Sequence, residues 1–342
     1  METTLVENLP QVTAAGIIIK AILILLVISA LAGFGTYIER KVLAFMQRRL
    51  GPMHVGPYGL LQIAADGIKL FTKEDIIPQN ANKLIFALAP AITAATAFIA
   101  MAAVPVFPDF VIPEWVPLIG GTYVPSIITD SDVSILIVLG MMAAGLYGPL
   151  LAGMAQANKW GIIGAARTAI QFLSYEVVTG LSILAPIMIV GSLSFVDFNN
   201  WQLEHGWMVM YQPIAFILFL IAGFAETNRT PFDLLENEAE IISGYATEYS
   251  GMRWGMFFIG EYANMITIGI IATFVFLGGY DPEATLGWLW TTLKIAFVFF
   301  LMLWARASWP HVRPDQLMWL CWKVLMPLAV VNVLITAIVM MF

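Results

Sequence analysis

The sequence contains little charge. Only 11% of its 342 residues are Asp, Glu, Lys or Arg, whereas 60% are hydrophobic. A soluble domain of this composition would expose large apolar patches and aggregate, so the composition predicts an all-α polytopic membrane protein. The formal net charge of −7 provides no basic surface for nucleic acid, and we expect no nucleic-acid partner.

Metal-binding and redox motifs are also scarce. Cys321 is the single cysteine, and one thiol can neither close an internal disulfide nor hold an iron–sulfur cluster. The histidines, His54, His205 and His311, lie outside the predicted spans and cannot serve as axial haem ligands within the bundle. No GxGxxG or P-loop motif occurs. We therefore expect this chain to bind no metal, haem, flavin or iron–sulfur cluster.

Long apolar runs dominate the sequence instead. The first eleven residues contain no basic residue, unlike the start of a signal peptide, so we expect the first apolar run to be retained as a span. A span needs about 20 mostly apolar residues. The sequence predicts eight spans, near 13–38, 84–104, 132–152, 170–193, 211–226, 254–278, 289–307 and 323–342.

The basic residues predict how the spans are oriented. Lys and Arg gather in the first, third, fifth and seventh loops, and the second, fourth and sixth loops contain none. The positive-inside rule then places the odd loops in the cytoplasm or matrix and both termini on the outer, periplasmic side. We thus predict one membrane domain over 1–342, with a first cytoplasmic loop at 39–83 and an acidic cytoplasmic loop at 227–253.

The first cytoplasmic loop contains a polar stripe with helical spacing. Gln62, Asp66, Lys69 and Lys73 follow one face, and apolar residues fall largely on the other. This pattern predicts an amphipathic helix over 58–73 at the membrane surface. Its role is either that of a plain interfacial anchor or that of the rim of an opening for a lipid-like molecule.

The stretch 226–261 is strongly acidic. It holds seven acids against two bases, Arg229 and Arg253. If Pro231 opens a helix, three of the acids share one face. Because crowded carboxyl groups cannot all ionise, we hypothesise a hydrated channel for proton transfer; the alternative is a solvated acidic loop. The acids are Glu226, Asp233, Glu236, Glu238, Glu240, Glu248 and Glu261.

Further charged residues lie within the spans or at their ends. Glu176 and Lys294 fall inside spans, where a charge is expensive and usually paired or functional. For Lys294 the alternative is a side chain that reaches outward to the membrane surface. Glu39, Arg40 and Arg306 lie at span ends and either anchor the helices or line a polar pocket.

Several segments, in this order, form a recognisable set of motifs. They are Glu39–Lys41, Gln47, Arg49, Gly51–Pro52, Val55–Gln62, Ala65–Gly67, Lys69–Phe71, Gln171, Ser174–Glu176, Glu226–Leu234 (ETNRTPFDL), Glu236, Glu238, Glu240, Glu248–Tyr249, Glu261–Tyr262 and Asp315–Met318. Together they resemble the H subunit family of proton-pumping NADH–quinone oxidoreductase (respiratory complex I), the NADH dehydrogenase subunit 1 of mitochondria. The resemblance covers nearly the whole chain.

The resemblance implies a function. Members of this family have eight core spans and no redox centre, and they dock the hydrophilic arm that carries the terminal iron–sulfur cluster and quinone pocket. They also contact small and antiporter-like membrane subunits and lipid. On the matching positions, Glu39, Arg40, Arg49 and Arg306 would border a tunnel for quinone, with ubiquinone favoured over menaquinone. Glu176 and the seven acids of the stretch 226–261 would form a proton path.

One position departs from the family pattern, because His311 stands where an arginine is usual. Histidine titrates near neutral pH, so Arg313 would carry that charge alone.

We expect a bacterial inner membrane, or the mitochondrial inner membrane if the chain is organellar. Three alternatives remain: a membrane-bound hydrogenase subunit without a quinone site, a stand-alone antiporter using Glu176 and Lys294, and an inert assembly scaffold.

Overall fold

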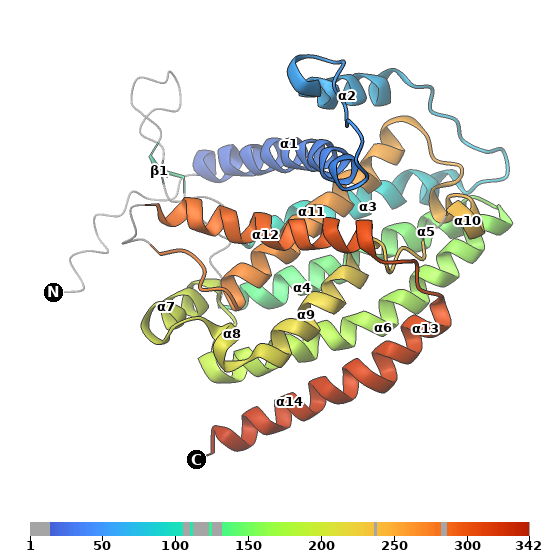
Figure 1. Cartoon of the computed structure of the whole chain (residues 1–342). Helices are drawn as coiled ribbons and strands as arrows, with labels where there is room; N and C mark the ends of the chain where they lie inside the picture. The colour runs from blue at the N-terminus through green and yellow to red at the C-terminus, as the bar shows by residue number, and fades with distance from the viewer. Residues whose placement is uncertain are drawn as a thin grey trace.

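The computed structural model describes most of the chain as helix (Figure 1). The described residues are 14–104, 110–111, 123–124, 132–235, 238–281 and 286–341. Within them, the only strands are β1 (Phe110–Val111) and β2 (Tyr123–Val124), which pair antiparallel with two residues each. The predicted all-α fold is therefore confirmed.

Each of the eight predicted spans corresponds to a helical segment. In the described part of the chain, seven segments are long and apolar enough to cross a membrane, and α9 (Pro213–Glu226), with 14 residues, is shorter. The seven are α1 (Ala14–Met46), α3 (Lys83–Ala102), α4 with α5 (Ser134–Gly145 and Tyr147–Ala155), α6 (Lys159–Val190), α11 (Gly251–Val275), α12 (Gly287–Ser308) and α13 continuing into α14 (Pro314–Leu320 and Met326–Val339).

Three helices extend further than their predicted spans. Helix α1 continues to Met46, so Glu39 lies in a helix and the helix-breaking Gly51–Pro52 comes only later. Helix α6 begins at Lys159 because the side chain of Asn158 accepts a hydrogen bond from Trp160 N and caps the first turn. Helix α13 begins with Pro314 in its first turn, and a π-helical stretch (Cys321–Leu325) joins it to α14.

Shorter helices occupy the connections. Besides α2 (Gln62–Thr72), they are the 3-10 turn η2 (Pro57–Gly59), α7 (Phe195–His205), α8 (Met208–Tyr211), α10 (Glu238–Ile241) and the 3-10 turn η3 (Gly244–Ala246). Helix α2 confirms the amphipathic helix predicted over 58–73, although the regular helix begins at Gln62. None of its residues is buried within this chain.

No helix opens at Pro231, which was the condition for three of the acids to share one helical face. Residues 231–235 form turns and bends, and the nearby helix α10 is one turn long. Phe232, Leu234 and Leu235 are each at most 3% exposed. In a single helix starting at Pro231, these three side chains would point in different directions around the helix axis and could not all face the core. The segment therefore follows a non-helical path that buries all three.

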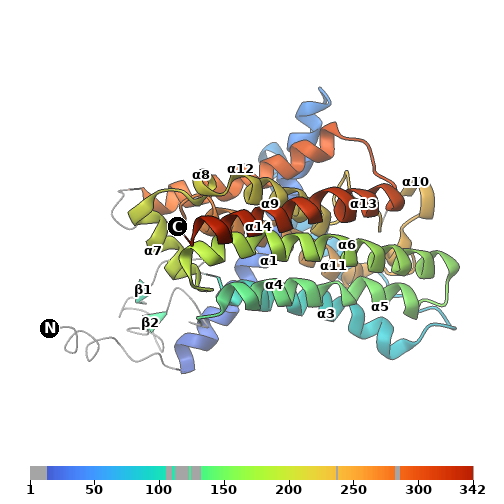
Figure 2. The ribbon, with the colours of Figure 1, turned by 90° about the horizontal axis from the view of Figure 1, so that it is seen from below.

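The helices run between two ends of the bundle (Figure 1). The charged end carries the connections 47–82, 227–250 and 309–313, and it lies at the right of Figure 1, where α10 is labelled. Helix α1 begins and α14 ends at the left, the opposite end. Figure 2 shows α4, α6 and α13–α14 side by side, with α1 crossing behind them. The predicted membrane orientation of the two ends stays a prediction.

Small residues bring the helices close together. A Cβ atom on Gly148 of α5 would lie 2.9 Å from Ala89 O of α3, and one on Gly153 would lie 2.4 Å from Gly161 O of α6. Such contacts between backbones are typical of helices that pack in a bilayer. At the charged end, Phe86 of α3 stacks on Tyr249 with ring centroids 4.0 Å apart and an interplanar angle of 4°. These contacts hold the acidic loop against the bundle.

Candidate functional site

Five side chains form a buried charged cluster at the charged end. Arg229 Nη1 lies 3.3 Å from Glu39 Oε1, and Arg229 Nε lies 2.6 Å from Glu261 Oε1. Arg306 Nη1 pairs with the same oxygen of Glu39. The Tyr262 hydroxyl donates to Glu39 Oε2 at 2.7 Å. The cluster therefore joins α1, α11, α12 and the connection that follows α9.

Helix geometry explains why Glu39 and Tyr262 meet. On α1, Ala32, Gly35 and Glu39 are buried and share one face at helical spacing. A Cβ atom on Gly35 would lie 2.9 Å from Tyr262 Cδ1, so only glycine lets the tyrosine ring approach the helix this closely. Glu39, one turn further along, then receives the tyrosine hydroxyl.

A polar contact with α6 holds the connection that carries Arg229. Gln171 Nε2 lies 2.6 Å from Ala225 O and 3.0 Å from Phe232 O, and it donates to both carbonyls. The same nitrogen lies 3.0 Å from Asn228 Oδ1. Because Gln171 is 1% exposed, these hydrogen bonds replace contacts with water. They fix the chain on both sides of Arg229.

Burial and charge determine the state of Arg229. Its side chain is 8% exposed, and those of Glu39 and Glu261 are 7% and 14% exposed. Burial lowers the pKa of Arg229, but Glu261, Tyr262 and Glu39 more than offset this effect and raise the pKa above its ordinary value. Arg229 thus stays charged throughout the range in which proteins fold. Its guanidinium carbon also lies 4.7 Å from the Tyr262 ring centroid.

The cluster is electrically balanced and has one accessible side. Two carboxylates face two guanidinium groups, and the Arg306 side chain is 31% exposed. Arg229 Nη2 is buried and makes no hydrogen bond within the described residues. A buried donor without an acceptor is costly. The cluster can therefore accept a polar oxygen from a bound molecule, and a new charge there would compete with the existing ion pairs.

Two further carboxyl groups interact with each other at the end of α9. Glu226 is the last residue of α9 and is 6% exposed, and its charge interacts with that of Glu176 on α6. The Tyr175 hydroxyl is buried near both acids and makes no hydrogen bond within the described part of the chain. No salt bridge in that part involves either acid. A nearby like charge disfavours the ionisation of both groups at once.

The acidic loop is tied to α6 through two further acids. Glu240 Oε2 lies 2.6 Å from Arg167 Nη1, and Glu248 Oε1 accepts a hydrogen bond from Asn158 Nδ2 at 2.8 Å. Asp233 is partly buried in the connection between α9 and α10. Glu236 lies outside the described residues, and although Glu238 begins α10, the placement of its side chain is not described.

The four residues predicted to border a quinone tunnel separate into two groups. Glu39 and Arg306 meet in the buried cluster. Arg40 is exposed and donates from Nη1 to Asp66 Oδ2 of α2 at 2.8 Å, and Arg49 is exposed and donates from Nε to Gln47 at 2.7 Å. Sequence reasoning assigned no role to Arg229 or Tyr262. The sequence did contain a signal for Arg229, because it is one of two bases among the seven acids of the stretch 226–261.

Lys294, the other charged residue predicted within a span, has different neighbours. Its ammonium group donates to Gly279 O at 3.3 Å and lies 4.9 Å from the Trp207 ring centroid. Both partners belong to connections at the opposite end of the bundle. Glu176 interacts with Glu226 and Tyr175 instead. The carrier site expected of an antiporter built on Glu176 and Lys294 is not supported by these contacts.

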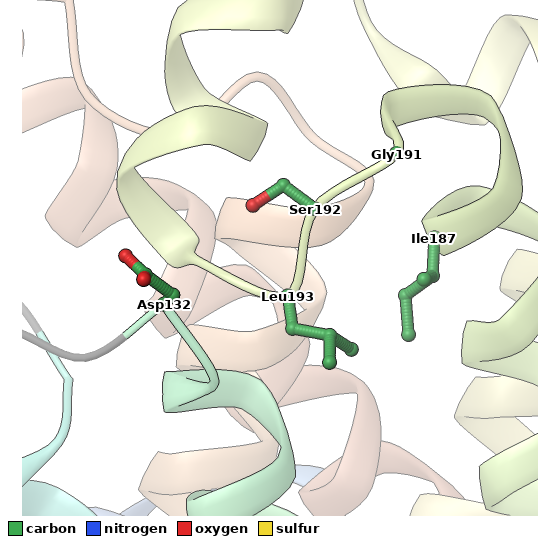
Figure 3. A pocket seen from close by; sticks show the side chains of 5 residues that line it. All are labelled: Asp132, Ile187, Gly191, Ser192 and Leu193. Atoms are coloured by element: carbon green, nitrogen blue, oxygen red, sulfur yellow. The ribbon is translucent and has the colours of Figure 1, made fainter.

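A cavity of about 440 Å³ lies at the opposite end (Figure 3). It is lined by residues just before α4, in the last turn of α6 and in the connection after α6: Asp132, Ile187, Gly191, Ser192 and Leu193. Asp132 is the one acid among these lining residues, which include no base, and the Ser192 hydroxyl donates to Asp197 at 2.5 Å. It shares no residue with the buried cluster and contains none of the predicted site residues.

The fold and the cluster define the class of protein: a multi-pass helical membrane protein with ion-paired residues buried at one end. A family model described as NADH dehydrogenase matches residues 19–337, and the chain belongs to this family. It is similar to proteins named as the H subunit of NADH-quinone oxidoreductase. Those from a Nitratiruptor species, Wolinella succinogenes and Sulfurimonas denitrificans are 71%, 64% and 63% identical over 326 residues, covering 94–95% of this chain and 97% of each relative.

Proposed function

We propose that this chain is the membrane subunit of a proton-translocating NADH–quinone oxidoreductase in a bacterial inner membrane. It belongs to an enzyme complex and contributes no redox centre of its own. The names and bacterial sources of its relatives support this assignment. Its partners are the hydrophilic-arm subunits at the charged end, together with small and antiporter-like membrane subunits and lipid.

The buried cluster carries the finer proposal, which is that the charged end encloses a chamber for the quinone head group. Glu39, Arg229 and Arg306 supply fixed charges next to a buried donor that has no acceptor among the described residues. A quinone carbonyl is a hydrogen-bond acceptor of the kind such a donor needs. Reduction to quinol places negative charge on these oxygens and draws protons. Arg40 and Arg49 lie nearer the surface and border the entrance, and ubiquinone is the favoured substrate.

The carboxyl groups beyond the cluster couple quinone reduction to proton movement. A negatively charged head group competes with Glu261 for Arg229. Glu261 then loses part of its ion pair, so its affinity for a proton rises. Glu226 and Glu176 lie next along the chain of acids and have no salt bridge within the described residues. The loop acids complete the path: Asp233, Glu236, Glu238, Glu240 and Glu248. We expect the whole set to titrate as coupled groups.

Glu226→Gln tests the function. Membranes carrying this variant are assayed for NADH–quinone electron transfer, for proton translocation, and for NADH oxidation by a water-soluble acceptor that bypasses the quinone site. We expect the bypass activity to persist while quinone-linked activity and pumping fall together. Glu204→Gln on α7 is the matched control, because Glu204 is exposed at the opposite end and should behave like wild type.

The other outcomes separate the alternatives. If all three activities of Glu226→Gln equal those of wild type, the acids form a solvated face and the proton path is wrong. If the bypass activity disappears as well, the residue serves assembly, as expected of a scaffold. If purified complex fails to bind a photoreactive quinone analogue near Arg306, the chain acts without a quinone site, as in a membrane-bound hydrogenase.

A further inference from the structure

A long apolar stretch separates the acids from the opposite end of the bundle. Residues 263–275 of α11 include no Asp, Glu, Lys, Arg or His, and they span about 20 Å at 1.5 Å per residue. The same absence holds for residues 213–225 of α9. On α11, Thr267 and Thr273 donate their hydroxyl groups to carbonyls of their own helix, and Asn264 lies at the end nearest the buried cluster. The stretch therefore offers few polar groups to a chain of water molecules.

Large apolar side chains fill the far part of this stretch. The rings of Phe276, just after α11, and Phe219 of α9 have centroids 5.6 Å apart. Those of Phe274 on α11 and Phe195 on α7 have centroids 6.2 Å apart. A buried water molecule needs about two to four polar partners, and apolar side chains provide none. We give the name apolar layer to the following fully buried residues of this core: Val138, Phe195, Phe198, Met208, Phe219, Val275 and Phe276.

Helices α7 and α8 lie at the opposite end of the bundle (Figure 1). We call the segment 195–211, which contains both helices, the cap. Phe195 and Gln202 are buried on the same face of α7, so the helix turns this face toward the apolar layer. In α8, Val209 N donates to Phe276 O at 3.0 Å. The cap is therefore attached to the chain that leaves α11, as well as packed on the layer.

Two amide side chains of α7 join the cap to the end of α11. Gln202 Nε2 donates to Phe274 O at 2.6 Å, and Gln202 Oε1 accepts from Gly278 N at 2.8 Å. Asn199 Nδ2 donates to Tyr280 O at 2.7 Å, and its Oδ1 accepts from Tyr280 N at 2.6 Å. The last carbonyls of a helix have no partner within it, so these contacts satisfy groups that water would otherwise reach. We call these hydrogen bonds the lock.

We propose that the cap and the apolar layer form a barrier that keeps protons from crossing this end of the bundle, and that Asn199 and Gln202 are the positioning residues that hold it closed. This inference rests on the proposed function, because a barrier is needed only where protons are moved. A proton held by Glu226 or Glu261 then has no route along α9 or α11 to the opposite end. The barrier thereby prevents the energy of quinone reduction from being lost as a proton leak.

The first test measures whether water reaches the apolar layer. Val138→Cys and Val275→Cys are made separately in the full complex, with Cys321→Ala removing the cysteine native to this chain. The purified complexes, in lipid nanodiscs that leave both faces accessible, are treated with a small charged methanethiosulfonate reagent during turnover. Mass spectrometry of this chain then gives the rate of modification. We expect neither cysteine to react, whereas Glu204→Cys on the exposed side of the cap reacts fully.

The second test opens the cap. Gln202→Leu removes a donor and an acceptor of the lock but keeps a side chain of similar size. We expect it to raise the modification rate of Val275→Cys about tenfold, because local opening of the cap becomes easier. In proteoliposomes it should also speed the decay of the proton gradient after an inhibitor stops turnover, with kcat for quinone unchanged. Asn199→Leu is the milder second variant, and Leu203→Ala on the exposed side of α7 is the matched control, which should behave like wild type.

Two results overturn the proposal. If either layer cysteine reacts as fast as Glu204→Cys in the otherwise unchanged complex, water passes the cap and no barrier exists. If Gln202→Leu and Asn199→Leu both assemble with wild-type reactivity and wild-type gradient decay, the lock does not hold the barrier closed. The proposed function fails separately, when Glu226→Gln leaves pumping intact, and that result does not alter the reactivity of the layer cysteines.

Discussion

Replacing Arg229 by methionine should destabilise the chain strongly. The guanidinium group is 2.6 Å from Glu261 and 3.3 Å from Glu39, and all three side chains are at most 14% exposed. Removing one partner of a buried ion pair leaves the other charge in a medium that solvates it poorly, at a cost of about 3–5 kcal/mol. Arg306 still pairs with Glu39, so Glu261 bears most of this cost.

A second substitution should recover much of the loss. In Arg229→Met combined with Glu261→Gln, both members of the closest pair are neutral, and removing both partners is far less costly than removing one. The assay is the amount of assembled complex in membranes, measured by native electrophoresis, followed by thermal denaturation of the purified complex. We expect little assembled complex for the single variant and substantial assembly for the double variant. Quinone-linked activity should stay low in both, because the fixed charge is missing.

Two results would refute this reasoning. If Arg229→Met assembles and denatures like wild type, the ion pairs contribute nothing to stability. If the double variant assembles no better than the single variant, the effect of Arg229 comes from packing on Tyr262 rather than from an uncompensated carboxylate. Arg229→Lys is a useful companion, since it keeps the charge but loses the paired geometry of the guanidinium group.

Three further predictions concern the supports of the site. Gln171→Leu should loosen the connection after α9 by about 1–3 kcal/mol, because two buried carbonyls lose their donor; faster proteolysis there would show it, and wild-type resistance would contradict it. Burial raises the pKa of Tyr249, opposed by Arg253, so its stabilising effect is present below pH 10.0 and is lost as the pH rises further. Tyr249→Phe should therefore show a smaller alkaline decline in thermal stability than wild type, and an equal decline would count against this. Asn332→Leu removes a hydrogen bond to Gln212 that holds α14, and should lower thermal stability by about 0.6–2 kcal/mol; no change would mean that apolar packing alone holds the helix.

Much of the helical organisation could be predicted because hydropathy is a local property. An apolar run of sufficient length must form a helix in a bilayer, whatever its neighbours are, since only a helix satisfies its own backbone. All eight helical segments were predicted in this way, seven of them long enough to cross a membrane and the short α9 in addition, as was the amphipathic helix α2 from the spacing of Gln62, Asp66 and Lys69. The family was also recognisable from motifs such as Glu226–Leu234.

Helix ends and the acidic connection were less predictable. Asn158 extends α6 by a capping hydrogen bond whose effect depends on the local backbone. Pro231 favoured a helix, but the burial of Phe232 and Leu235 imposed another path. At Pro231, burial that forms only in the folded chain outweighed a weak local preference.

The partners of the charged residues were decided by the tertiary structure alone. Local sequence determined that Glu39, Arg229, Glu261 and Arg306 lie near the charged ends of spans, and that such charges need compensation. It could not determine which pairs form, because Glu39 is 190 positions from Arg229 and 267 from Arg306. Those pairings depend on how α1, α11 and α12 pack and rotate against one another, which is set by close contacts such as that of Gly35 with Tyr262.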